Sequence, residues 1–135
     1  MKNLFIMTIT LFALAAPIAG RADSGKIKQF VGLWEAVDPD DGSHQILSIT
    51  DNADGTAKLR LFDTYFTLCN GGRAIGEGTA ETAKKQSLDS EDFTIKCFEP
   101  NVTHPTPTTL TKNPDGTLTR DRATLSPLIY HQTNK

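Results

Sequence analysis

Short runs in which apolar and polar residues alternate recur along the chain after residue 32, separated by clusters of Asp, Asn, Gly and Pro. The clearest run, 57–62, has an apolar side chain at every second position up to Leu61. A period of two places alternate side chains on opposite faces of a strand, so this run predicts a strand with one buried and one solvated face. By the same criterion we expect strands at 33–37, 44–49, 57–62, 65–69, 73–79, 93–98, 108–112, 117–120 and 128–131.

Regularly spaced short strands with turns between them are typical of all-β barrels and sandwiches. Hairpin connections throughout indicate an antiparallel up-and-down meander, which avoids free sheet edges by closing on itself or by folding into two packed sheets. We expect closure into a small barrel of about eight strands, with a β-sandwich as the alternative. Before the first strand, Ser24 is expected to cap a short helix with Ile27, Phe30 and Val31 on one face.

The N-terminal residues predict a signal peptide. Lys2 supplies a positive start, the run from Leu4 to Ala16 is apolar and nearly uncharged, and small residues follow up to Ala22. The apolar run is shorter than the ~20 residues that a membrane-spanning helix needs. We therefore expect cleavage after Ala22, with Gly20 as a second candidate, and no membrane span after processing. The sequence predicts a signal peptide over 1–22 and one β-barrel domain over 23–135, exported to the periplasm or the extracellular space.

Composition and charge narrow the range of partners. The formal net charge is −2, and the basic residues are scattered along the chain rather than clustered. A protein that binds nucleic acid usually gathers Lys and Arg on one face, so nucleic acid is not an expected partner.

The two cysteines, Cys69 and Cys97, allow one intramolecular pairing. Export places them in an oxidising compartment, where a disulfide persists. The alternative, a reactive or metal-binding thiol pair, is typically signalled by close spacing such as Cys-x-x-Cys, and these two cysteines are far apart in the sequence. We therefore predict a structural disulfide.

Clustered carboxylates at Asp38, Asp40 and Asp41 raise the question of a calcium site, because calcium prefers oxygen ligands. The spacing does not follow a calcium-binding loop, since the glycine comes one position early and Ile49 stands where the bidentate Glu belongs. We expect a solvated turn here and no bound metal.

The histidines, His44, His104 and His131, are isolated in the sequence, and no Gly-x-Ser-x-Gly elbow or phosphate-binding loop is present. A small hydrolase or isomerase would need His44 or His131 to meet a carboxylate in a pocket. We expect no cofactor and no catalytic site.

The stretch Gly32-Leu33-Trp34 resembles the Gly-x-Trp signature of lipocalin-like barrels. The resemblance implies that a short helix closes the floor of the barrel and that Trp34 packs just above it, which makes Gly32 and Trp34 a structural motif. In that group an arginine of the last barrel strand lies across the Trp ring, a part that Arg120 or Arg122 could take. The chain also resembles small exported bacterial proteins of unassigned function that share a Trp-Glu-Ala start followed by Asp-Gly-Ser.

Lipocalin-like barrels usually hold small apolar ligands, so the resemblance implies such a ligand here, touching Phe66, Phe93 or Tyr130. An eight-stranded interior is just wide enough to be filled by side chains or to hold one small ligand. Large aromatic residues among the inward positions favour a mostly filled interior. The predicted interior comprises Trp34, Ala36, Leu47, Ile49, Leu59, Leu61, Phe66, Leu68, Phe93, Ile95, Leu110, Leu118 and one of Ile129 or Tyr130.

Together these features predict an exported, non-enzymatic β-barrel that binds a small apolar ligand or a partner protein. The alternative is an inhibitor or interaction protein that presents an exposed segment, such as the turn at 38–43 or the proline-rich stretch at 100–107, to a secreted enzyme. A small hydrolase or isomerase is the least favoured class.

Overall fold

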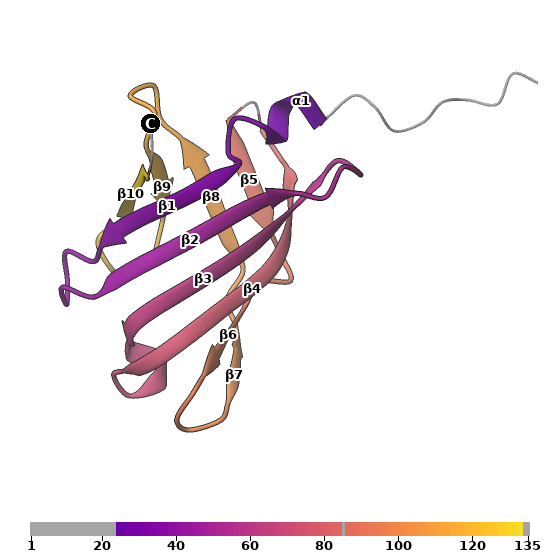
Figure 1. Ribbon diagram of the computed structural model, residues 1–135. Helices are drawn as coiled ribbons and strands as arrows, with labels where there is room; N and C mark the ends of the chain where they lie inside the picture. Colours follow the sequence, from indigo (N-terminus) through magenta and orange to yellow (C-terminus); the bar gives the residue numbers. More distant parts are fainter. Residues whose placement is uncertain (1–23, 85, 134–135) are drawn as a thin grey trace, which may run out of the picture.

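A computed structural model describes residues 24–84 and 86–133, which form an all-β antiparallel barrel with one short helix (Figure 1). The predicted signal peptide, 1–22, lies outside the described residues. None of the described helices has the length and apolar character to cross a membrane. The elements are α1 (Ser24–Ile27), β1 (Gly32–Val37), β2 (His44–Asp51), β3 (Thr56–Phe66), η1 (Thr67–Cys69), β4 (Gly72–Thr82), β5 (Ser87–Ser90), β6 (Thr94–Cys97), β7 (Thr103–Pro105), β8 (Thr108–Lys112), β9 (Leu118–Arg120) and β10 (Leu128–Gln132).

The sheet closes on itself. Its order is β3-β2-β1-β10-β9-β8-β5-β4-β6-β7, and β3 also pairs with β4, which closes the barrel and leaves β6 and β7 at the far side of β4. All the pairings are antiparallel. The expected closed meander is therefore confirmed, and the β-sandwich is excluded for the described residues.

The ten strand segments form eight walls, that is, eight strands of the barrel, because two of these walls are each made of two separate segments. β5 and β6 both pair with β4, and β8 and β7 in turn pair with β5 and β6. Along β4 the register changes by one residue between the pair Glu81↔Asp89 and the pair Glu77↔Thr94. A one-residue change of this kind is a β-bulge, which bends a strand and increases its twist. The β6–β7 part consequently extends beyond the neighbouring walls at the end of the barrel away from α1 (Figure 1).

The end beside α1 is closed by apolar side chains. Ile27, Phe30 and Trp34 are fully buried, and the Nε1 of Trp34 donates a hydrogen bond of 2.8 Å to the carbonyl oxygen of Phe30. This arrangement matches the floor that the Gly-x-Trp resemblance implied. The cation over the Trp34 ring is Lys112, whose Nζ lies 4.2 Å from the ring centroid, so the expectation of Arg120 or Arg122 at this place is wrong. The end of β8 reaches Trp34, whereas both arginines lie near the other end of the barrel.

Most of the predicted interior is buried, but Leu68 differs from expectation. Leu68 is 53% exposed because β3 continues through residue 66 and then turns into η1, where the period of two no longer holds. Of the two alternatives on the last strand, Tyr130 is fully buried and Ile129 is 40% exposed. The buried set from the predicted list is Trp34, Ala36, Leu47, Ile49, Leu59, Leu61, Phe93, Ile95, Leu110, Leu118 and Tyr130, with Phe66 packed against it.

Gly76 and Gly78 on β4 allow the close backbone approach that glycines within a strand indicate. A Cβ at Gly78 would lie 2.8 Å from the backbone Cα of Phe93, and a Cβ at Gly76 would lie 2.5 Å from the ring of the same residue. Phe93 therefore fills the space in which side chains at positions 76 and 78 of β4 would otherwise lie.

The predicted disulfide joins Cys69 at the end of η1 to Cys97 at the end of β6, with a Cα–Cα distance of 5.4 Å. Both cysteines are buried. The bond ties the β3–β4 connection to the wall formed by β6, at the end of the barrel opposite the floor.

Candidate functional site

The end of the barrel opposite Trp34, which we call the mouth, contains a pocket of about 550 Å³. One side of the pocket is formed by the end of β3 and by η1, and another by the segment 106–108. The loop 121–125, which follows β9, forms the third side. The chain therefore fills its barrel at the floor and leaves space at the mouth.

The polar side chains buried at this end of the barrel include Gln45, Asp63, Arg120 and Tyr130. Each continues a row of inward-facing residues, because side chains two positions apart on a strand share a face. Gln45 continues the row of Leu47 on β2, and Asp63 continues the row of Leu61 on β3. Arg120 and Tyr130 likewise stand two positions after buried leucines on β9 and β10.

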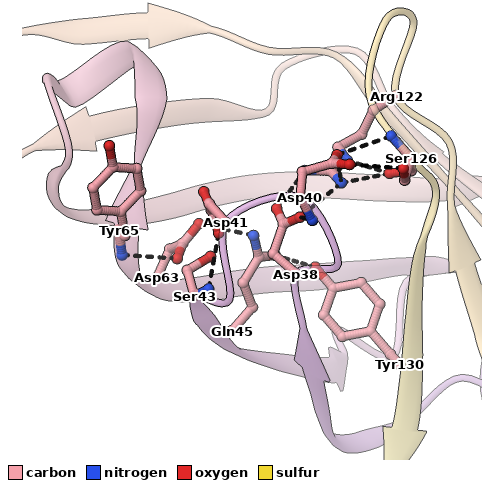
Figure 2. A network of polar contacts seen from close by, with 10 residues as sticks. All are labelled: Asp38, Asp40, Asp41, Ser43, Gln45, Asp63, Tyr65, Arg122, Ser126 and Tyr130. Carbon is pink, nitrogen blue, oxygen red and sulfur yellow. Dashed lines mark hydrogen bonds and ion pairs between the residues drawn. The ribbon is translucent and has the colours of Figure 1, made fainter.

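Three of these side chains form a chain of hydrogen bonds (Figure 2). The Tyr130 hydroxyl donates to the Oε1 of Gln45 at 2.5 Å, and the Nε2 of Gln45 donates to the Oδ2 of Asp63 at 2.8 Å. The other oxygen of Asp63 accepts the backbone N–H of Tyr65 at 3.1 Å. The chain links β10, β2 and β3 across the interior and fixes the orientation of each group.

Burial raises the pKa of the Asp63 carboxyl, and the nearby carboxylates of Asp41 and Asp38 add to the rise. The hydrogen bond from the Tyr65 amide opposes it. Burial also raises the pKa of Tyr130, against the positive charge of Arg120, so its hydroxyl keeps its proton and remains a donor at neutral pH.

Replacing Asp63 by asparagine is expected to change how stability depends on pH. A pKa raised above the unfolded value, about 3.8, means that the folded protein binds the proton more tightly than the unfolded chain. The free energy of unfolding of the wild type should therefore fall, relative to Asp63→Asn, as pH rises from about 3.8 through the folded-state pKa. Urea unfolding followed by Trp34 fluorescence at a series of pH values measures this difference.

Taking the difference between the two proteins removes the contribution of groups that titrate alike in both, such as Asp38, whose pKa is lowered. Two stability curves that run parallel from pH 3 to pH 7 would contradict the expected role of Asp63.

A second set of contacts, which we call the Arg122 cluster, joins Arg122, Asp38, Asp40 and Ser126 (Figure 2). The Arg122 guanidinium bonds both oxygens of Asp38, and its Nη2 lies 2.9 Å from the Oδ2 of Asp40. The backbone N–H and hydroxyl of Ser126 donate to Asp40 at 2.9 and 2.7 Å. The cluster therefore ties the β1–β2 turn to the loop that forms one side of the pocket.

The acidic turn thus differs from the solvated turn that the sequence predicts. Asp38 is 4% exposed. Burial, the largest single effect, opposes its ionisation. The hydrogen bonds from Arg122 and from the Asp40 amide, together with the positive charges of Arg122 and Arg120, outweigh burial and hold the pKa of Asp38 below its usual value. The sequence does not reveal this pairing because Arg122 lies 84 residues away from Asp38.

Arg120, the other arginine, lies at the base of the pocket and is 5% exposed. Its Nε donates to the Oγ1 of Thr108 at 2.8 Å, and its guanidinium carbon lies 5.6 Å from the centroid of the Phe93 ring. The guanidinium also interacts with the hydroxyl of Tyr130, and the side chain lines the pocket.

The three residues named as ligand-facing occupy different places. Phe66 lines the pocket. Phe93 is buried under Arg120, and Tyr130 is buried with its hydroxyl bonded to Gln45. The interior predicted from the sequence did not include Gln45, Asp63 or Arg120, although the period of two places Gln45 on the same face as Leu47 and Ile49. The period of two on β3 and β9 already indicated that Asp63 and Arg120 face the interior.

No protein-family model matches the chain, and no curated protein matches it. A solved structure, EF1p2_mFAP2b bound to DFHBI, is similar, with a TM-score of 0.51 and 12% sequence identity. The match covers 83% of this chain and 100% of that chain. At this identity the likeness shows the fold alone.

His44 and His131 lie outside the barrel, beside a shallow depression of about 480 Å³ on its outer wall. The Nε2 of His44 is 3.8 Å from Glu35, and both side chains are more than 40% exposed. Within residues 24–84 and 86–133, no three side chains of His, Cys, Asp or Glu gather in a way that could hold a metal ion. His44 and His131 therefore lie on a different surface from the mouth pocket.

Proposed function

We propose that this chain is an exported, non-enzymatic protein that binds a small, largely apolar molecule in the pocket at the mouth of its barrel. The observation that carries the proposal is the division of the interior into a filled floor and an open mouth. A volume of about 550 Å³ lies in the range of about 300–1,000 Å³ that is usual for small-molecule sites.

The lining of the pocket supports this proposal. Phe66, Leu68, Pro107, Ala123 and Leu125 offer apolar surface, and polar residues, among them Asp63, Thr108 and Arg120, line the rest of the pocket. Ligand sites commonly combine an apolar lining with a few polar groups that fix the orientation of the ligand. The disulfide supports the exported location, because such bonds persist in oxidising compartments.

Binding to a secreted protein is the second candidate. The β6–β7 part extends beyond the neighbouring walls, and the connection between its strands exposes Phe98 and Val102 at 49% and 40%. Exposed apolar side chains at the tip of a hairpin favour a contact with another protein. The turn at 38–43 offers less, because its Asp38 is buried and bound to Arg122.

Replacing Ala123 by tryptophan is expected to abolish small-molecule binding. Ala123 lines the pocket and is exposed, so an indole at this position can enter the pocket without disturbing the core. The neutral probe N-phenyl-1-naphthylamine fluoresces when it leaves water, and its titration measures the affinity of the pocket. We expect the wild type to bind the probe and Ala123→Trp to bind it at least about tenfold more weakly, the equivalent of about 1.4 kcal/mol.

Ile75→Trp is the matched control, because Ile75 is 37% exposed on the outer face of β4 and lies away from the pocket. It should bind the probe as the wild type does. Equal binding by Ala123→Trp and the wild type would show that the probe binds elsewhere, and a wild type that binds no apolar probe would refute the proposal.

A further inference from the structure

Arg120 is a buried cation without a carboxylate partner. It is 5% exposed, and among residues 24–84 and 86–133 no carboxylate lies within ion-pair distance of its guanidinium. An arginine side chain keeps its charge at every pH that a folded protein meets. Burying a charge is costly unless a partner compensates it, and the hydroxyls of Thr108 and Tyr130, the Phe93 ring and the more distant carboxylate of Asp38 compensate it only in part.

The carboxylates near Arg120 are already engaged or lie in solvent. Asp38 is paired with Arg122, which also binds Asp40. Asp63 accepts bonds from Gln45 and Tyr65, and burial raises the pKa of its carboxyl. Asp41 and Asp121 also line the pocket, but both are exposed at its entrance, where water screens their charge. Arg120 is therefore the buried cation at the base of the pocket that, among the described residues, has no carboxylate at ion-pair distance.

We propose that the ligand of this pocket carries one organic anionic group, a carboxylate or a sulfonate, and that this group binds at Arg120. The guanidinium fork matches the two oxygens of such a group. The apolar part of the ligand then lies toward Phe66, Leu68 and Leu125. This inference rests on the proposed function, since it names the chemical class of the molecule that the pocket takes.

Two probes with the same ring system test the inference. 1-Anilinonaphthalene-8-sulfonate carries a sulfonate, and N-phenyl-1-naphthylamine lacks it. Arg120→Gln should weaken binding of the anionic probe by about 10- to 100-fold, the range for a lost hydrogen bond to a charged group, and should change binding of the neutral probe less than about twofold. Arg60→Gln is the control, because it removes the same charge from an exposed position on β3.

Arg120→Lys keeps the charge and loses the fork, so it provides a second variant if Arg120→Gln does not fold. It should bind the anionic probe more weakly than the wild type and more tightly than Arg120→Gln. In the wild type, the NMR signal of the Arg120 Nε–H group should shift when the anionic probe is added and stay in place with the neutral probe.

The outcomes separate the two proposals. If Arg120→Gln lowers the affinity for both probes equally, or leaves the anionic probe unaffected, the inference is overturned and small-molecule binding stands. If the wild type binds the neutral probe and not the anionic one, the inference is also overturned. If the wild type binds neither probe, both proposals fail.

Discussion

Replacing Trp34 by alanine is expected to lower the free energy of unfolding by about 3–5 kcal/mol. The side chain is fully buried above Ile27 and Phe30, and removing it leaves a cavity that the strands around it cannot close. A domain of this size has a total stability of only about 5–15 kcal/mol, so the variant should retain a small margin or unfold. Urea unfolding followed by far-ultraviolet circular dichroism measures the change without using the Trp34 fluorescence.

Trp34→Phe separates packing from hydrogen bonding at the same position. It retains an aromatic ring under Lys112 but loses the N–H group that bonds the carbonyl of Phe30 at 2.8 Å. Its cost should be about 1–3 kcal/mol, the range for leaving a buried polar group without a partner. A loss below about 1 kcal/mol for Trp34→Ala would show that the floor is not the packed core described above. Because Trp34 lies at the other end of the barrel, Trp34→Phe should bind N-phenyl-1-naphthylamine as the wild type does.

The sequence was informative about the floor and about the faces of the strands because both follow from local patterns. A period of two identifies which side chains point inward, and it holds on β2, β3, β8, β9 and β10. The same period extends to Asp63 and Arg120, which are buried at the ends of their strands. Sequence reasoning placed a turn at Asp63 because aspartate is frequent in turns, and a buried aspartate is plausible only when its partner is known.

Pairings between distant residues are the part that the sequence could not supply. Gln45 meets Asp63 because β2 and β3 pair in that register, and Arg122 meets Asp38 because β1 and β10 close the barrel. That Lys112, and not an arginine, lies over the Trp34 ring depends likewise on where β8 ends. β5 was missed because Ser87–Ser90 holds a single apolar residue, too few to show a period. Closure of the barrel, rather than local pattern, therefore determines the chemistry of the mouth.

Replacing both Cys69 and Cys97 by alanine is expected to lower the free energy of unfolding by about 3–4 kcal/mol, because the bond closes a loop between cysteines 28 residues apart and restricts the unfolded chain. The melting temperature should fall by roughly 10–20 °C. Thermal unfolding followed by circular dichroism measures the shift. The reduced wild type keeps both buried sulfur atoms and loses only the cross-link, so it shows how much of the loss comes from the bond and how much from packing.

The double variant should not respond to reductant, whereas the wild type should lose most of the same stability when reduced. A wild-type melting temperature that reductant leaves unchanged would contradict this account. The bond also bears on the mouth, because η1 follows directly on Phe66 and carries Leu68, and both residues line the pocket. Cys69 holds η1 against β6, so loss of the bond frees the wall on which the apolar part of the ligand is proposed to lie. The reduced protein should therefore bind N-phenyl-1-naphthylamine more weakly even at temperatures where it remains folded.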